Sequence, residues 1–219
     1  MTSPVPQIRI EACLALMKRR GPDIQSAMEI MIDSGSYISL LHSRLSIIDL
    51  DKRANQPFSV GPLTMVFNGE CYSYKEIRRE LEKEGWESSF RTHSDTEVLL
   101  CSILYWGWEK ALSKAEGMWA LAVYDSRDKS LTLARDRFGE KPLYYYVDQG
   151  LVYFGSEPKY IFHLLGRELP VNQEHLLSYL VNGYRSLYKS GESTFFEELH
   201  EVPAGTAIEF SPWMSTGRS

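Results

Sequence analysis

The segment Asn68-Gly69-Glu70 lies where an apolar, strand-like stretch (64–67) meets a charged, helix-like stretch (74–84). An Asn-Gly pair is usually a turn, because glycine tolerates positive φ and asparagine nearly does. The same pair can also present a side-chain amide and a backbone N–H together, which are the two donors that an oxyanion hole needs. The pair is therefore a candidate for carbonyl chemistry, with a plain turn as the alternative, and the chemistry requires a nucleophile nearby.

Candidate nucleophiles and metal ligands are few. The three cysteines, Cys13, Cys71 and Cys101, are an odd number without paired spacing, so neither a disulfide framework nor a zinc knuckle is expected. The five histidines contain no i, i+4 pair and no His-Glu-x-x-His pattern. We therefore expect no metal site.

The composition is typical of a soluble globular protein, with 43% hydrophobic and 24% charged residues. Lys and Arg number 24 against 29 acidic residues, without a clustered basic stripe, so nucleic acid is not an expected partner. The longest apolar stretch, 98–106, is about half of a membrane span, and no signal-peptide pattern opens the chain. We expect no membrane partner and a cytoplasmic location.

Hydrophobic spacing predicts helices connected to a mostly antiparallel sheet. The helix over 8–18 should stop at Gly21-Pro22, and either Ser94 or Asp95 can cap the helix that runs to about Tyr105. Further helices are predicted at 74–84, 158–165 and 172–181. Strands are predicted at 36–50 (two, or one bent), 63–67 and 204–210, with hairpins over 118–136 and 142–157.

Strands as apolar as those of the two hairpins should be buried on both faces, so helices must cover the sheet. No internal repeat or low-complexity linker is present. The predicted domain is 1–210, followed by a tail, 211–219, that has few core-forming residues and is expected to be disordered.

Nine segments in register carry a family resemblance. They are RRGPD (19–23), HSRLSIIDL (42–50), NQPF (55–58), FNGECYSYKEIRREL (67–81), HSDTEVLL (93–100), EGMWALAVYD (116–125), ARDRFGEKPLYY (134–145), FGSEPKYI (154–161) and EVPAGT (201–206). Together they closely resemble the glutaminase domain of glutamine-hydrolysing asparagine synthetases, a glutamine amidotransferase of type 2 with an N-terminal nucleophile. The resemblance runs from about Met17 to about Phe210, and the segment 135–145 favours this branch over the sugar-phosphate and purine branches.

The resemblance implies an α+β fold, a four-layer α/β/β/α sandwich of two antiparallel sheets of the Ntn-hydrolase type. In such enzymes a Cys at the mature N-terminus attacks the side-chain amide of glutamine, and its own α-amino group manages the protons. Ammonia then travels to a second domain, where aspartate is activated by ATP.

The resemblance also implies site residues. Arg44 matches the arginine that grips the substrate α-carboxylate, with a surface arginine as the alternative. Asn68 and Gly69 match the oxyanion donors. Glu70 and Asp95 match the acids that hold the α-ammonium group, and Asp95 can also cap its helix.

Two further sets of residues are assigned roles, one in the pocket and one in the structure. Backbone carbonyls near Ile47 and Ile48 are expected to line the same pocket. The group Arg135, Asp136 and Arg137 is interpreted as a structural ion-pair group, with a catalytic role as the alternative.

The sequence departs from the family pattern at its start. Members begin with Met and Cys-Gly-Ile on a short strand, whereas this chain begins MTSPVPQIRIEACLALMKRRGPD and has the helix without the nucleophile strand. Thr2, which removal of Met1 would expose, is a poor substitute for the Cys nucleophile, because the two prolines that follow it cannot belong to a central strand. Cys13 lies within a helix pattern and Cys71 beside the Asn-Gly pair, and both are interpreted as packing residues.

The sequence also ends before the family's ATP-pyrophosphatase domain, to which ATP and Mg would belong, so no cofactor is expected in this chain. We expect an asparagine synthetase-type glutaminase domain that is inactive as written. The alternative is a pseudo-enzyme that binds glutamine or a partner without catalysis, and a third possibility is an active subunit whose nucleophile is supplied otherwise. The expected partners are L-glutamine and a synthetase domain, a synthetase subunit or a second copy.

Overall fold

The computed structural model describes residues 5–33, 36–86, 90–183 and 194–211. Within these ranges the helices are α1 (Gln7–Met17), α2 (Tyr74–Lys83), α3 (Asp95–Trp106), α4 (Trp108–Lys114), α5 (Pro158–Leu165) and α6 (Gln173–Asn182), with a short 3-10 helix at Lys52–Ala54. The strands are β1 (Ile24–Asp33), β2 (Ser36–Arg44), β3 (Phe58–Val60), β4 (Leu63–Cys71), β5 (Gly117–Asp125), β6 (Ser130–Arg135), β7 (Tyr144–Asp148), β8 (Leu151–Gly155), β9 (His200–Glu201) and β10 (Ala207–Phe210).

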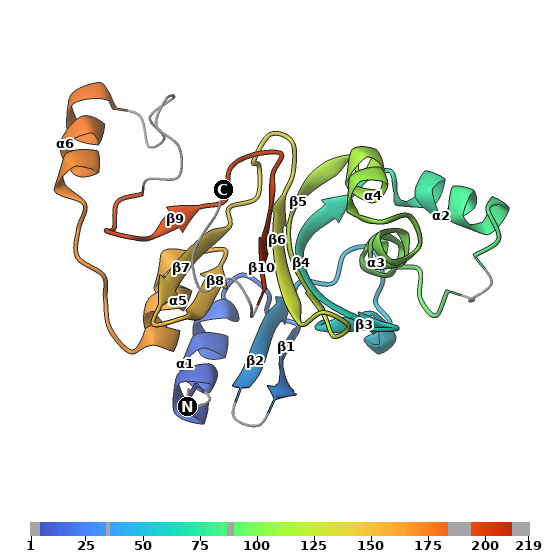
Figure 1. Ribbon diagram of the computed structural model, residues 1–219, viewed down its shortest axis with the longest axis horizontal. Helices are drawn as coiled ribbons and strands as arrows, with labels where there is room; N and C mark the ends of the chain where they lie inside the picture. The colour runs from blue at the N-terminus through green and yellow to red at the C-terminus, as the bar shows by residue number, and fades with distance from the viewer. Residues whose placement is uncertain (1–4, 34–35, 87–89, 184–193, 212–219) are drawn as a thin grey trace.

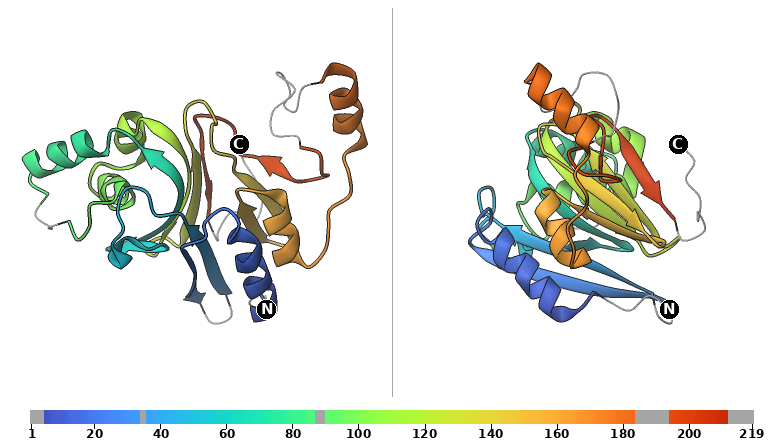
Figure 2. Two further views of the ribbon diagram at one scale, coloured as in Figure 1. Left: turned by 180° about the vertical axis from the view of Figure 1, so that it is seen from behind. Right: turned by 90° about the vertical axis from the view of Figure 1, so that its left-hand side faces the viewer.

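These elements form the predicted four-layer α/β/β/α sandwich (Figure 1). Helices α2, α3 and α4 cover the outer face of a five-stranded antiparallel sheet with the order β10-β6-β5-β4-β3. The opposite layer contains the sheets β1-β2 and β8-β7-β9, and α1 and α5 pack on it (Figure 2). The sandwich is therefore confirmed, although in the described ranges its second β layer consists of two separate sheets.

Alternation along β4 and β5 explains why the central sheet is buried on both faces. Met65 and Leu121 point into the core beneath the helices, together with Leu99 of α3. Their neighbours Val66 and Ala122 point into the core between the two β layers. Successive side chains of a strand lie on opposite faces, so an almost continuously apolar strand packs two layers at once.

The predicted elements differ from the structure in a few places. The apolar run 36–50 stays in the sheet only to Arg44, because the residues after it fold into a loop around that side chain. Strands β1, β3 and β9 and helix α4 were not predicted. A single residue, Gly107 with φ 81°, separates α4 from α3, and the predicted tail lies outside the described residues beyond Ser211.

Candidate functional site

A cavity of about 1480 Å³ lies between the two β layers. Its walls come from β2 and the loop that follows, the inner face of β4 and β5, the start of α3, and β8. All of the predicted site residues line it: Arg44, Ile47, Ile48, Asn68, Gly69, Glu70 and Asp95. The structure thus gathers into one place residues that are up to 51 positions apart in the chain (95 − 44).

Two strand edges face this cavity. In the described part of the chain, β2 is hydrogen-bonded only to β1, and β8 only to β7. Both β2 and β8 line the cavity, whose apolar lining includes Leu41, Val66, Ala120, Ala122, Val152 and Phe154. An unpaired edge presents backbone N–H and C=O groups, so the cavity combines an apolar lining with two edges suited to strand pairing.

The Asn68-Gly69 pair is part of strand β4, so the alternative interpretation as a plain turn is wrong. Asn68 pairs with Ala120 of β5, and its side chain is exposed toward the cavity. The side-chain nitrogen Nδ2 donates a hydrogen bond to Ser156 Oγ at 3.0 Å. Sequence reasoning gave Ser156 no role, although it lies within one of the nine family segments.

Gly69 is required by close contact between strands. Its φ is 145°, and a Cβ atom there would lie 2.0 Å from the carbonyl oxygen of Met118 and 2.7 Å from Trp119 Cα. Neither neighbour is a flexible side chain that can move aside. A side chain at position 69 would therefore separate β4 from β5 beside Asn68.

We expect Gly69→Ala to lower the free energy of unfolding by about 3 kcal/mol or more, because backbone strain and steric overlap add. The matched control is Gly85→Ala, since Gly85 also has positive φ (91°) but no described atom within 4 Å of the position that a Cβ would occupy. It should cost only about 1 kcal/mol. Urea unfolding measures both, and equal losses would contradict the steric explanation.

Arg44 is buried, with 8% of its surface exposed, so the alternative of a surface arginine is wrong. Its Nη1 donates to the carbonyl of Asp51 at 3.0 Å and to Asn55 Oδ1 at 2.7 Å, and its Nη2 donates to the carbonyl of Asp49. A guanidinium carries five N–H donors. Within the described residues these three bonds leave two N–H groups of Arg44 without an acceptor. A carboxylate can accept two parallel hydrogen bonds from one guanidinium, so two is the number that it needs.

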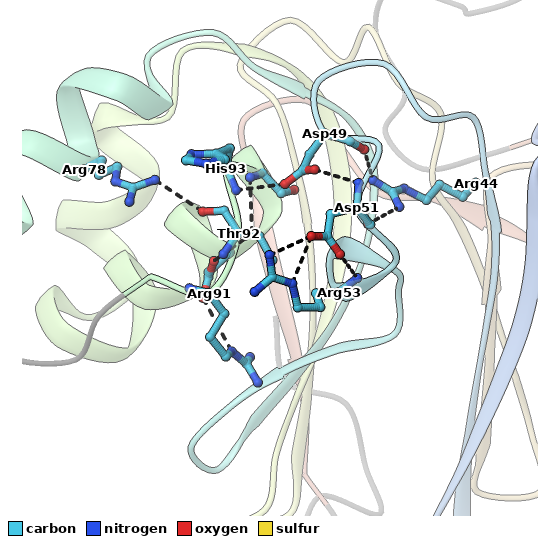
Figure 3. A network of polar contacts seen from close by, with 10 residues as sticks. Arg44, Asp49, Asp51, Arg53, Arg78, Arg91, Thr92 and His93 are labelled. Carbon is cyan, nitrogen blue, oxygen red and sulfur yellow. Dashed lines mark hydrogen bonds and ion pairs between the residues drawn. The ribbon is translucent and has the colours of Figure 1, made fainter.

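The loop that Arg44 organises is tied to the start of α3. Asp49 accepts a hydrogen bond from the backbone N–H of His93 at 2.8 Å, and Asp51 pairs with Arg53 at 2.6 Å. Figure 3 shows this network, which joins the loop after β2 to residues 91–93. Arg44 and Asp95 are thereby held relative to each other by short polar contacts.

Asp95 joins the end of β4 to the beginning of α3. Its Oδ2 accepts the N–H of Cys71 at 2.9 Å and its Oδ1 accepts that of Thr96 at 2.8 Å, while Ser94 provides the helix N-cap. Burial raises the pKa of the Asp95 carboxyl above 3.8, the two N–H donors oppose the shift, and the charge of Glu70 adds to it. A cation at this position would relieve both the burial cost and the repulsion.

None of the described residues considered as a substitute nucleophile has the environment of one. Cys13 and Cys71 are 1% and 0% exposed. Burial raises the pKa of each thiol to about 11, so the reactive thiolate is scarce at neutral pH. Thr2 lies outside the described residues.

His42 of β2 lines the same cavity as a neutral ring. Its Nε2 lies 3.2 Å from the carbonyl oxygen of Phe67 and therefore carries the proton, while its buried Nδ1 has no hydrogen-bond partner among the described residues. Burial lowers the pKa of His42 from 6.5 to about 4, and the charge of Arg44 contributes. Protonation of this ring is therefore disfavoured in the folded state.

We expect this shift to weaken the fold in acid. The pKa of His42 is lower in the folded state than in the unfolded state. Its contribution to the free energy of unfolding is therefore complete above pH 6.5, and about 3 kcal/mol of it is lost as the pH falls toward 4. His42→Gln keeps a donor for Phe67 and should flatten this part of the pH profile in urea unfolding. The exposed His163→Gln should not, and an unchanged slope in His42→Gln would contradict the assignment.

Arg135 and Asp136 have structural roles. Arg135 forms an ion pair with Glu201 at 2.8 Å and donates to the carbonyl of Val202. Asp136 accepts backbone N–H groups, including that of Trp119 at 3.1 Å. Arg137 donates to the carbonyl of Ser113. These contacts fix the connection from β6 to β7 and favour a structural role over a catalytic one, although the ion pair is with Glu201 and not within the group.

Comparison with known proteins agrees with this geometry. The family model of the glutamine amidotransferase domain matches residues 2–216. The chain belongs to the glutamine amidotransferase family. This amidotransferase domain is 38% identical over 167 residues to the glutamine-hydrolyzing asparagine synthetase 1 of Bacillus subtilis (strain 168), covering 75% of this chain and 25% of that protein. It is 32% identical over 199 residues to the amidase chry2 of Gibberella zeae, covering 90% and 27%.

A solved structure supports the fold of the amidotransferase domain. The glutamine phosphoribosylpyrophosphate amidotransferase of B. subtilis, complexed with ADP and GMP, superposes with a TM-score of 0.50 at 25% identity, over 60% of this chain and 30% of that one.

The chain spans about a quarter of the length of the two curated relatives, the asparagine synthetase and the amidase. No helix in the described ranges is long and apolar enough to cross a membrane.

Proposed function

We propose that this chain is the glutaminase domain of an asparagine synthetase-like protein and that its substrate is L-glutamine, bound in the central cavity. The observation that carries the proposal is that Arg44, the oxyanion pair Asn68-Gly69 and the acids Glu70 and Asp95 line one cavity. An amino acid has a carboxylate and an ammonium group, and this cavity offers a partner for each. The amidation of aspartate in a synthetase domain is part of the proposal, supported by the names of the relatives.

Each residue has a proposed role. The two Arg44 donors that the described residues leave unused bind the α-carboxylate, and Glu70 and Asp95 bind the α-ammonium. Asn68 and the N–H of Gly69 stabilise the oxyanion that forms when the carboxamide is attacked. Carbonyls near Ile47 and Ile48 border the pocket on the side of the loop.

The nucleophile is proposed to belong on a strand between β2 and β8. Such a strand would pair with both edges and end beside Asn68, which is where a terminal Cys would face the carboxamide carbon. The buried thiols of Cys13 and Cys71 favour the proposal that residues 1–219 alone bind glutamine without hydrolysing it. The second candidate, a glutamine-binding pseudo-enzyme, rests on the same observation.

Calorimetric titration of the unmodified chain with glutamine tests the proposed function, because a glutamine site binds whether or not a nucleophile is present. We expect saturable binding. The affinity should rise as the pH increases above 3.8, the ordinary pKa of an aspartate, because the raised pKa of Asp95 places its ionisation above that value. Asp95→Asn should weaken binding about ten- to a hundred-fold and remove most of this dependence.

The matched control for the titration is Glu157→Gln, another carboxylate that lines the cavity. This variant should keep both the affinity and the pH profile of the unmodified chain. Absence of glutamine binding at millimolar concentration would overturn the proposed function. We further propose a cytoplasmic location and association with a synthetase domain or subunit, or with a second copy.

A further inference from the structure

We infer that Ser156 is a positioning residue for the oxyanion site: its hydroxyl holds the Asn68 side-chain amide so that one N–H stays directed at the reacting carbonyl. The inference rests on the proposed function, because the amide has a reaction to serve only if glutamine is attacked in this cavity. The contact that carries it is the 3.0 Å hydrogen bond from Asn68 Nδ2 to Ser156 Oγ. It joins β4 to the segment after β8, across 88 residues of sequence.

The Asn68 amide depends on this contact for its orientation. Its side chain is exposed toward the cavity rather than packed in the core. Among the described residues, Ser156 is its one hydrogen-bond partner. Without the serine hydroxyl, the terminal amide torsion of Asn68 would be broad and nearly two-fold, as it is for asparagine in general.

Ser156 itself is held by regular structure on both sides. β8 ends one residue earlier at Gly155, which pairs with Tyr144 of β7. α5 begins at Pro158, and the carbonyl of Glu157 accepts the backbone N–H of Tyr160 at 3.0 Å. The serine therefore occupies a fixed joint between a strand and a helix, which is where a positioning group is most effective.

The donor count suits this role. A carboxamide nitrogen has two N–H groups, so donating one to Ser156 leaves the other for an oxyanion. The serine oxygen acts as acceptor in this bond. Preorganisation of this kind acts on the tetrahedral state more than on the planar substrate, because charge develops on the oxygen only there.

The test uses the unmodified chain and two ligands, glutamine and 2-amino-4-sulfamoylbutanoate, whose tetrahedral sulfonyl group imitates the attacked carboxamide. Ser156→Ala should weaken binding of the sulfonamide about three- to ten-fold and change glutamine binding less than about two-fold. Ser156→Thr keeps a hydroxyl and should restore the sulfonamide affinity. Ser39→Ala, at another serine that lines the cavity, should change neither affinity.

A second readout follows the contact itself in the protein without ligand. The side-chain ¹⁵N–¹H₂ signals of Asn68, assigned by their loss in Asn68→Asp, should shift in Ser156→Ala and not in Ser39→Ala. Unchanged signals would overturn the inference, and so would equal weakening of both ligands, which would indicate a merely structural role. If the signals shift but the unmodified chain binds neither ligand, the proposed function fails and the positioning role with it, although the contact stands.

Discussion

Addition of a Cys-Gly-Ile strand ahead of Ile8, with the initiator Met removed, is expected to give a chain that releases ammonia from glutamine, whereas residues 1–219 alone release none measurably. Loss of a covalent nucleophile costs about six orders of magnitude in turnover, and oxyanion donors with substrate contacts retain only a small advantage over water. The free α-amino group of the added Cys would accept the thiol proton and later pass it to the leaving ammonia.

The same addition should raise the melting temperature. An added strand would pair with the edges of β2 and β8 and cover part of the apolar lining of the 1480 Å³ cavity. Replacement of the added Cys by Ala is the matched control: it should keep the gain in melting temperature and abolish ammonia release.

An enzyme-like rate of glutamine hydrolysis by the unmodified chain would contradict this account. In that case Asn68 and Gly69 would serve a nucleophile elsewhere, and Cys71→Ser would be the first variant to measure. Because Cys71 is buried and the pKa of its thiol is raised, we do not expect it to be that nucleophile.

Arg44→Ala is expected to weaken glutamine binding about ten- to a hundred-fold, because one partly buried, charge-assisted contact to the α-carboxylate is lost. Arg44→Lys should recover little of the affinity, since an ammonium cannot form the planar fork. Titration calorimetry at neutral pH measures both variants.

Arg44 also holds the loop after β2, so a control must separate the loop from the ligand. Asn55→Ala removes one of the loop contacts of Arg44, at 2.7 Å, and leaves the charge in place. It should change glutamine affinity no more than about three-fold. Equal losses in Asn55→Ala and Arg44→Ala would assign the effect to loop geometry and contradict the carboxylate contact.

Local signals in the sequence located most of the elements. Helix α5 spans the predicted 158–165, because a proline at its first turn and the left-handed Gly166 after its end mark both boundaries. The hairpin of β5 and β6 follows from two apolar runs joined by a polar turn.

Two of the elements that were missed, β1 and α4, depend on tertiary contacts. β1 is largely half-buried or exposed along its length, and its order comes from pairing with β2, in a register from Ile24–Arg44 to Asp33–Ser36. α4 has seven residues and no side-chain cap, so its sequence carries little helical signal. Neither element can be inferred from a short window of sequence.

Motifs of residue types with a distinctive geometry could be read from the sequence as candidate site residues. Arg44, Asn68, Gly69 and Asp95 were identified from their motifs, and the structure brings them to one cavity. The hydrogen bond of Ser156 was not predictable, because a serine hydroxyl makes many kinds of contact and its partner lies 88 residues away. The use of three Arg44 donors by its own loop likewise appears only in three dimensions.

A crystal structure of the unmodified chain soaked with glutamine tests the central claim most directly, since the proposed absence of a nucleophile from residues 1–219 would leave the ligand intact. We expect glutamine in the central cavity, with its α-carboxylate on Arg44, its α-ammonium between Glu70 and Asp95, and its carboxamide oxygen at Asn68 Nδ2 and the N–H of Gly69. An empty cavity at saturating glutamine, or a ligand bound away from these residues, would contradict the assignment of this chain as a glutamine-binding amidotransferase domain.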